Sequence, residues 1–176
     1  MQIRPATSAD AAVIARLHAQ SWRVAYRGMY RDEYLDGDIV ADRTRVWTAR
    51  LESPAGNQSV LLAIDGDEPL GFVRVYGNDD VRWGTLVDNL HVRAEQQRRG
   101  IGRRLLAASA AWSRERYPDA LLYLWVLEGN AKAQRFYEGL GGARYESQDT
   151  EPPGGGTLTK LRYVWGSLEP LIAEAR

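Results

Sequence analysis

Three short runs rich in β-branched and aromatic residues follow one another with only tight turns between them. The runs cover residues 60–64, 71–76 and 81–92, and the turns at 65–69 and 77–80 are rich in Gly, Asp and Asn. Connections this short leave no room for crossover helices, so neighbouring strands are expected to run antiparallel. The pattern therefore predicts a three-stranded antiparallel meander in the middle of the chain.

Helices and further strands are predicted on both sides of the meander from apolar spacing and from Gly and Pro stops. In chain order they are a strand at 3–6, helices over about 7–26 and 39–51, a helix over 100–116, a strand over 121–127, a helix over 131–138, strands at 143–146 and 158–165, and a last helical turn or frayed end at 167–176. The segment after the meander has the order β-α-β-α. The predicted fold class is therefore α+β, or mixed α/β.

Length and composition bound the function classes. The 176 residues have the size of one domain with no linker or repeat, so we expect a single domain over 1–176. Basic and acidic residues balance at 23 each, so neither nucleic acid nor a membrane surface is an expected partner. The absence of Cys and the two distant His residues predict no metal site. No apolar span or export segment is visible, so a cytoplasmic location is expected.

The most informative segment is residues 89–106, where a strand is followed by a polar loop and then a helix. Gly100 and Gly102 stand where the helix begins, and free N–H groups converge with the positive end of the helix dipole at such a start. A Walker loop is excluded because no Gly-Lys-Ser/Thr follows, and the dinucleotide fingerprint would need Gly at Leu105. The local charge suits a ligand with several phosphates, because five arginines flank the loop: Arg93, Arg98, Arg99, Arg103 and Arg104.

This segment resembles the pyrophosphate loop of the GNAT superfamily of N-acetyltransferases, Gln/Arg-x-x-Gly-x-Gly/Ala after a strand ending Leu-x-Val. The chain matches that loop with Gln97, Arg98, Arg99, Gly100, Ile101 and Gly102. A second family signature, Asn-x-x-Ala-x-x-Phe-Tyr on a helix after a strand, is similar to residues 130–141. Residues 21–28 also resemble the acceptor-side helix of many members, so the resemblance covers roughly residues 3–145.

The resemblance implies a fold, a co-substrate and its binding residues. The GNAT fold has a central, mostly antiparallel twisted sheet of about six or seven strands, with a V-shaped splay between the two middle strands and about four flanking helices. The implied co-substrate is acetyl-CoA, with the pantetheine arm paired to the main chain of the strand and the pyrophosphate held at the helix start. The implied cofactor-binding residues are Leu90, His91, Val92, Gln97, Arg98, Arg99, Gly100, Ile101, Gly102, Arg103, Asn130 and Tyr137.

The implied chemistry is direct attack of a neutral amine on the thioester, which requires a base for the amine and an acid for the departing thiolate. Tyr137 matches the family position whose hydroxyl protonates the CoA sulfur, and the alternative is a core aromatic beside Phe136. Asn130 matches a cofactor-side position, and it could also cap the helix that starts at Ala131. Both interpretations of Asn130 can hold together.

Family members place the base at different positions, so the resemblance does not assign it to one residue. Asp88 is the candidate, since strand alternation puts it on one face with Leu86, Leu90 and Val92, and some members carry a base there. The alternative is an Asp that only orders a turn, and Glu128 is the reserve. Alternation places His91 on the opposite face, where it is expected to pack, and His18 is likewise interpreted as a packing residue.

The acceptor is expected to be a primary amine on a small molecule. A protein N-terminus or lysine is the alternative, and a non-catalytic acyl-CoA-binding module is the second. A pocket closed by Trp22, Tyr26, Tyr30 and loop 152–156 would favour small amines, whereas a protein acceptor needs an open groove. A homodimer is possible. An acidic run either attracts a cationic amine or forms a solvated face, and its members are Asp32, Glu33, Asp36 and Asp38.

One departure from the family concerns the end of the second signature. Members commonly have Phe after the glycine that matches Gly141, and this chain has Gly142. The missing ring predicts looser packing of the short helix against the sheet.

Overall fold

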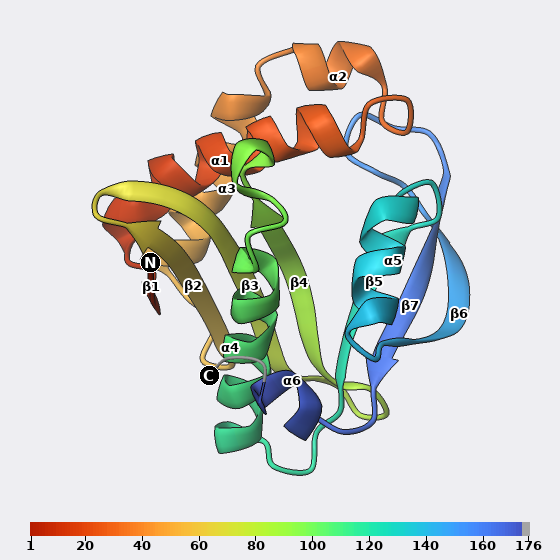
Figure 1. Cartoon of the computed structure of the whole chain (residues 1–176). Coiled ribbons are helices and arrows are strands. Elements are labelled where there is room, and N and C mark those ends of the chain that lie inside the picture. Colours follow the sequence, from red (N-terminus) through yellow and green to blue (C-terminus); the bar gives the residue numbers. More distant parts are fainter. Residues whose placement is uncertain (174–176) are drawn as a thin grey trace.

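The computed structural model describes residues 1–173 and contains one seven-stranded sheet with helices on its faces (Figure 1). The strand order is β1-β2-β3-β4-β5-β7-β6, and every pair is antiparallel except β4–β5. This mixed sheet confirms the predicted α+β class. The strands are β1 Gln2–Pro5, β2 Gln58–Asp65, β3 Glu68–Asp80, β4 Gly84–Val92, β5 Leu122–Leu127, β6 Ala143–Thr150 and β7 Leu158–Trp165.

The helices follow the predicted order with one addition, α2, which is too short to show an apolar period. Residues 174–176 at the end of the predicted last turn lie outside the described residues. The helices are 3-10 turn η1 Ser8–Asp10, α1 Ala11–Ala25, α2 Asp32–Asp36, α3 Ile39–Glu52, 3-10 turn η2 Ala94–Gln96, α4 Ile101–Arg116, α5 Ala131–Gly139 and α6 Glu169–Ala173. None of the described helices is long and apolar enough to cross a membrane.

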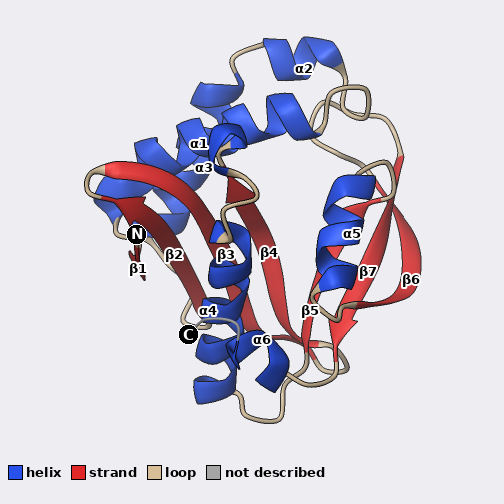
Figure 2. Ribbon diagram, viewed as in Figure 1, coloured by secondary structure: helices blue, strands red, loops and turns tan. Residues whose placement is uncertain are grey.

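Helices lie on both faces of the sheet (Figure 2), and the apolar side chains of the two faces form separate cores. On one face, α4 and α5 pack against β3, β4, β5 and β7 through residues such as Leu105 and Tyr137. On the other face, α1 and α3 cover β2 and β3 around Trp47 and Phe72. The sheet is therefore the middle layer of three, and the face of β5 and β7 opposite α5 is covered by aromatic side chains instead of a helix.

The two middle strands pair over only a short length. β4 and β5 match at three positions, from Thr85–Leu122 to Val87–Leu124, although the strands continue to Val92 and Leu127. Beyond Val87 the strands diverge, as Figure 1 shows between β4 and β5. This divergence is the predicted V-shaped splay, and it leaves the β5-facing edge of β4 without a partner strand in the described residues.

A β-bulge in β4 stands where the splay begins. The register with β3 passes from Arg74–Asn89 to Val75–Val87, so Asp88 is an extra residue with no direct partner in β3. A bulge breaks the strict alternation of a strand and increases its local twist. Asp88 thus lies at the point where β4 stops pairing with β5.

The bulge overturns the predicted sidedness of this segment. Leu90 and Val92 pack in the core on the α4 side, whereas Asp88 contacts Arg74 on the opposite face, where His91 also lies against α1. The prediction that Asp88 shares a face with Leu90 and Val92, away from His91, is therefore wrong. Alternation assumed an unbroken strand, and one inserted residue reverses it.

The short helix α5 is anchored despite the missing family phenylalanine. A Cβ placed on Gly142 would lie 2.7 Å from Cζ2 of Trp165, and the Trp165 indole N–H donates to the Leu140 carbonyl at 2.8 Å. The indole therefore fills the space next to Gly142. The expected looser packing is not found.

Both histidines are buried between α1, α3 and the sheet. Their ring centroids are 4.6 Å apart, His18 Nδ1 accepts a hydrogen bond from the Trp47 indole at 2.9 Å, and His91 Nδ1 lies 2.8 Å from the Ser21 hydroxyl. Burial lowers the pKa of His91 to about 4. Burial also lowers the pKa of His18 well below its usual range, with smaller effects from His91 and Arg43.

Stability is expected to fall as the pH drops from about 6.5 toward 4. Well above pH 6.5 the two histidines are neutral in both the folded and the unfolded state. Below pH 6.5 they become protonated in the unfolded chain but stay neutral in the folded protein until the pH reaches their lowered pKa values, so protonation favours unfolding. For His91 the loss is about 1.6 kcal/mol between pH 6.5 and 5, and His18 acts in the same direction. Urea unfolding at half-unit pH steps measures it.

The variant His91→Phe serves as the comparison, because the chain has only two histidines and an aromatic ring preserves the packing. Its free energy of unfolding should depend on pH about half as steeply in this window. Equal slopes for the two proteins, or a flat profile for the parent, would contradict the assignment of the effect to buried neutral imidazoles.

Candidate functional site

The start of α4 has the backbone shape of an anion site. Gly100, the N-cap residue, has φ +79° and Arg98 has φ +64°, and left-handed residues in such a turn bring successive N–H groups to one concave side. The first N–H groups of α4 have no acceptor within the helix. A Cβ placed on Gly102 would lie 3.3 Å from Phe136 of α5, so a side chain at this position would occupy the space between the start of α4 and α5.

Side chains of the loop tie the two halves of the molecule together at this point. The Gln97 amide donates to the Val92 carbonyl at 3.3 Å, and its oxygen accepts from Lys132 on α5. The Gln97 side chain thus spans the splay between the end of β4 and α5. Arg99 binds Gln96 inside the loop, and the remaining predicted ligands of this segment would act through their main chain.

The helix α5 presents the second predicted group. Asn130 Oδ1 accepts from the Ala133 N–H at 3.1 Å, so it caps α5 as the alternative interpretation predicted. Tyr137 is buried, with its ring 5.3 Å from Phe136 and 6.0 Å from Trp165 between centroids. Burial raises the pKa of Tyr137 above its usual range, so its hydroxyl keeps its proton at neutral pH.

Tyr26, at the end of α1, is the functional candidate that sequence reasoning named only as a pocket wall. Burial raises its pKa, and Tyr30, Tyr137 and Asp88 contribute further, so these groups interact across the splay. The electrostatic influence of both Tyr137 on α5 and Asp88 on β4 therefore reaches Tyr26. The signal in the sequence was the resemblance of residues 21–28 to the acceptor-side helix of the family.

Asp88 is held by arginines on the α3 face. Its Oδ2 atom accepts a hydrogen bond from Arg74 at 3.0 Å and lies 3.7 Å from an Arg50 nitrogen. Arg74 also donates to the Gln58 side chain at 2.9 Å. Burial, followed by the charge of Arg50, lowers the pKa of Arg74 to about 10, and Asp88 opposes that shift. The reserve candidate Glu128 is instead exposed just after β5, 4.0 Å from Arg144.

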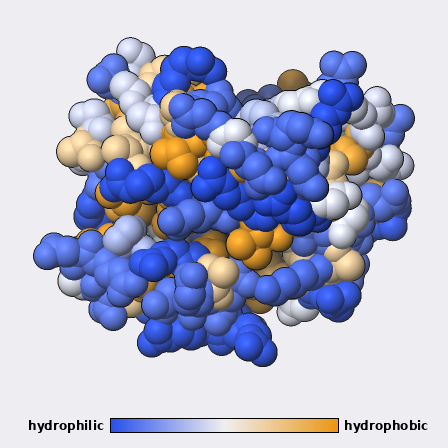
Figure 3. Space-filling view, turned by 90° about the horizontal axis from the view of Figure 1, so that it is seen from above, coloured by the Kyte–Doolittle hydropathy of each residue, from blue (hydrophilic) through white to orange (hydrophobic). Residues whose placement is uncertain are grey.

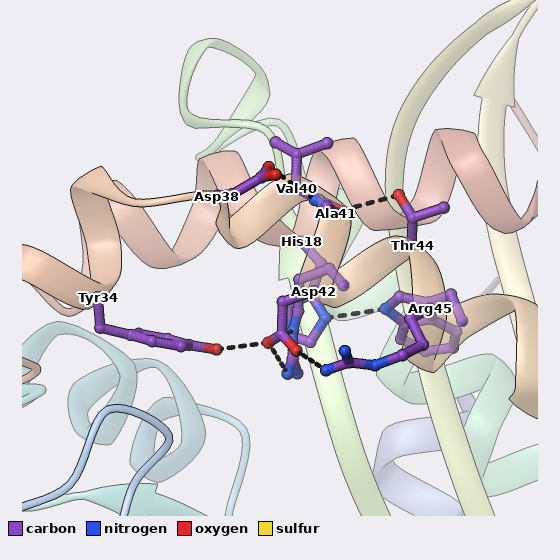
Figure 4. Close-up of polar contacts among 10 residues, drawn as sticks. His18, Tyr34, Asp38, Val40, Ala41, Asp42, Thr44 and Arg45 are labelled. Atoms are coloured by element: carbon purple, nitrogen blue, oxygen red, sulfur yellow. Dashed lines mark hydrogen bonds and ion pairs between the residues drawn. The ribbon is translucent and has the colours of Figure 1, made fainter.

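The acidic run has structural roles. Asp32 and Asp36 each lie 2.7 Å from a guanidinium nitrogen of Arg27, and Asp38 caps α3 by accepting from the Ala41 N–H at 3.3 Å (Figure 4). Arg27 lowers the pKa of Asp36 below its usual range. These three carboxylates are therefore neutralised or used as a cap, which favours the structural interpretation over attraction of a cationic amine.

Loops from both halves of the sheet meet over the open end of the splay. A Cβ placed on Gly154, between β6 and β7, would lie 2.7 Å from Cβ of Tyr34 on α2, and one on Gly155 would lie 3.7 Å from the Arg31 guanidinium. A Cβ on Gly129, after β5, would lie 2.7 Å from the Met29 sulfur. Figure 1 shows the β6–β7 loop beside the α1–α2 connection, and Figure 3, which looks down on this end, shows small apolar patches among polar residues.

Aromatic side chains of α1 and of the segment after it form a cluster. Trp22 and Tyr30 have ring centroids 5.3 Å apart, and Tyr26 stacks on Tyr30 at 4.8 Å. Below them, Trp125 of β5 lies 4.2 Å from the Arg162 guanidinium and 4.4 Å from Lys160 Nζ, measured to its ring centroid. Aromatic side chains and the Asp88 carboxylate therefore lie around the end of the splay.

Both the sequence and the fold of this chain are similar to those of known proteins. Residues 19–141 match the model of the acetyltransferase (GNAT) family. A Mycobacterium tuberculosis protein named as a probable N-acetyltransferase is 32% identical over 140 residues, which are 78% of this chain and 77% of that protein.

Two solved structures are similar to the fold. A GCN5-related N-acetyltransferase from Rhodopseudomonas palustris has a TM-score of 0.74 and 23% identity, with 93% of each chain covered. The PaiA N-acetyltransferase of Thermoplasma acidophilum, solved with coenzyme A, has a TM-score of 0.71 and 19% identity, with 93% of this chain and 98% of that chain covered. With a family model that spans most of the chain, the protein belongs to the acetyltransferase (GNAT) family and is an acetyl-CoA-dependent N-acetyltransferase.

Proposed function

We propose that this protein, as a single domain over residues 1–176, transfers the acetyl group of acetyl-CoA to a primary amine of a small molecule by direct attack. The unpaired edge of β4 supports binding of the pantetheine arm along Leu90, His91 and Val92. The left-handed turn and free N–H groups at the start of α4 support binding of the pyrophosphate. The coenzyme A in the Thermoplasma structure of the same fold favours this arrangement.

In this proposal Tyr137 is the acid and Asp88 the base. A buried phenol with a raised pKa is uncharged at neutral pH, so it donates a hydrogen bond to the departing sulfur. On passing its proton to the thiolate it becomes a phenolate, which must be reprotonated before the next turnover. Arg74 holds the Oδ2 atom of Asp88, so Oδ1 is the atom that would accept the proton of the amine. The bulge places that carboxylate where β4 leaves β5, on the side of Tyr26 and Tyr30.

The contact between the β6–β7 loop and α2 is the observation that favours a small acceptor. Gly154 packs so closely on Tyr34 that an extended chain could not pass between them without moving the loop. A protein acceptor would need an open groove at this point. Acetylation of a protein N-terminus or lysine is the competing function, and a non-catalytic CoA-binding module is the third.

The acceptor class is tested with amino acids, a polyamine and an aminoglycoside against eight-residue peptides, using release of the CoA thiol as the signal. Small amines should be turned over with a kcat/KM at least about tenfold above that of the peptides. The Gly154→Ala variant should raise KM for the small acceptor and leave KM for acetyl-CoA unchanged, because the new methyl group would displace the loop from Tyr34.

The Gly156→Ala variant is the matched control, since both glycines have φ +91° but a Cβ on Gly156 would contact nothing within 4 Å. It should retain the parental KM. If peptides are the better acceptors, the small-molecule assignment is wrong. If acetyl-CoA binds but no amine is acetylated, the protein is a non-catalytic CoA-binding module.

The Tyr137→Phe variant should lower kcat by at least about tenfold, because it removes the proton donor for the thiolate while the buried ring keeps its packing. The rise in Tm caused by acetyl-CoA should be unchanged, since the pyrophosphate and pantetheine contacts are elsewhere. Steady-state kinetics and thermal unfolding measure the two effects. Parental kcat in this variant would remove Tyr137 as the acid.

The Asp88→Asn variant should lower kcat by about 100-fold and remove the low-pH limb of the kcat/KM profile, because the amide cannot accept a proton. Removing this charge also leaves buried Arg74 without its carboxylate, so Tm is measured alongside, and Asp88→Glu, which retains the charge, should recover part of the rate. An unaltered rate and pH profile in folded Asp88→Asn would show that the base is elsewhere.

A further inference from the structure

The wall of the acceptor side formed by α3 has more cationic than anionic groups. Asp42 accepts from Arg43 and Arg45 at 2.6 Å each, and also from the Tyr34 hydroxyl at 2.7 Å (Figure 4). Asp88 is likewise shared between two arginines, Arg74 at 3.0 Å and Arg50 at 3.7 Å. Four arginines thus share two carboxylates, which leaves positive charge at the end of the splay.

Among these arginines Arg50 has the weakest ionic partner. Arg43 and Arg74 are buried and make short bonds to their carboxylates. Arg50 is 28% exposed, and its hydrogen bond is to the neutral side-chain oxygen of Asn89 at 3.2 Å, with Asp88 at 3.7 Å. Burial lowers the pKa of Arg50, Asp88 partly opposes this shift, and the charge of Arg43 adds to it. The guanidinium also lies 5.1 Å from the centroid of the Trp47 ring, so its partners are one shared carboxylate, a neutral amide and an aromatic face.

A second cation, Lys160, lies on β7 in the other half of the sheet, where it is level with Leu127 of β5. Lys160 Nζ lies over the Trp125 ring at 4.4 Å, and the ion pairs of the described residues do not include Lys160. Burial and then Arg162 lower the pKa of Lys160. Lys160 could therefore also pair with an anionic group of a ligand.

Building on the proposed function, we propose that the acceptor amine carries an anionic group close to its nitrogen and that Arg50 binds this group, with Lys160 of β7 as a second cation. The carboxylate of an α-amino acid and the phosphonate of an aminophosphonate share this chemistry. Arg50 lies next to Asp88, so the amine that gives its proton to Asp88 and the anionic group that Arg50 binds must be only a few atoms apart in the acceptor molecule. Polyamines lack such an anion, and the positive wall repels them.

The test compares α-amino acids with their amides, which have the same size and amine but no negative charge. The twenty L-amino acids, their amides and the aminophosphonate analogue of leucine are assayed by release of the CoA thiol, and their binding to the CoA-loaded enzyme is measured by calorimetry. At least one acid should exceed its amide by about tenfold or more in kcat/KM and in affinity. The leucine phosphonate distinguishes carboxylate from phosphonate as the preferred anion.

Arg50→Gln should reduce kcat/KM for the preferred acid by about tenfold and that for its amide by less than about twofold. Arg16→Gln, an exposed arginine of α1, is the control and should change neither. Three results would overturn the proposal. Amides or spermidine could be used as well as every acid, Arg50→Gln could reduce kcat/KM equally for the acid and its amide, or no acid could bind to the CoA complex. Binding of an acid with no acetyl transfer to any amine would contradict the proposed function instead.

Discussion

The short parallel contact between β4 and β5 is the constraint on which the rest of the molecule depends. Two strands of the sheet share three register positions and then separate, and the bulge at Asp88 stands at the point of separation. A regular strand would continue to pair with its neighbour and satisfy its own N–H and C=O groups. Interrupting that pairing leaves an edge inside the sheet that an extended ligand can complete.

Both halves of the molecule are anchored around this opening. Residues of α4 and α5 pack into the same core, so the two sides cannot drift apart, and Gln97 joins the end of β4 to Lys132 of α5. At the other end, Gly154 and Gly129 bring loops of the second half onto α2 and the α1–α2 connection. Packing on both sides therefore keeps β4 and β5 apart beyond Val87 and Leu124, which suits a site that must position two substrates.

Charge is distributed unevenly around the opening. Asp32 and Asp36, at the two ends of α2, are paired with Arg27, and Asp38 caps α3. The arginines of α3 and β3 instead share Asp42 and Asp88. A chain with no net charge therefore presents a positive wall beside the proposed base, and buried arginines in a low-dielectric site act strongly on whatever lies next to them.

The sequence by itself determined the order and type of nearly every element, because apolar spacing, turn residues and caps are local properties. The meander, the helix start at Gly100 and the cap at Asn130 all follow from neighbours within a few positions. The five-residue helix α2 escaped detection because a period cannot show in so short a segment.

Tertiary structure alone decided which side chains meet. The bulge moved Asp88 to the face of His91 and Arg74, and strict alternation could not foresee it because a bulge depends on pairing with another strand. Tyr26, Asp88 and Tyr137 come from segments far apart in the chain, and so do Arg50 and Lys160. Their arrangement depends on how the helices pack across the splay, a long-range property that no local pattern contains.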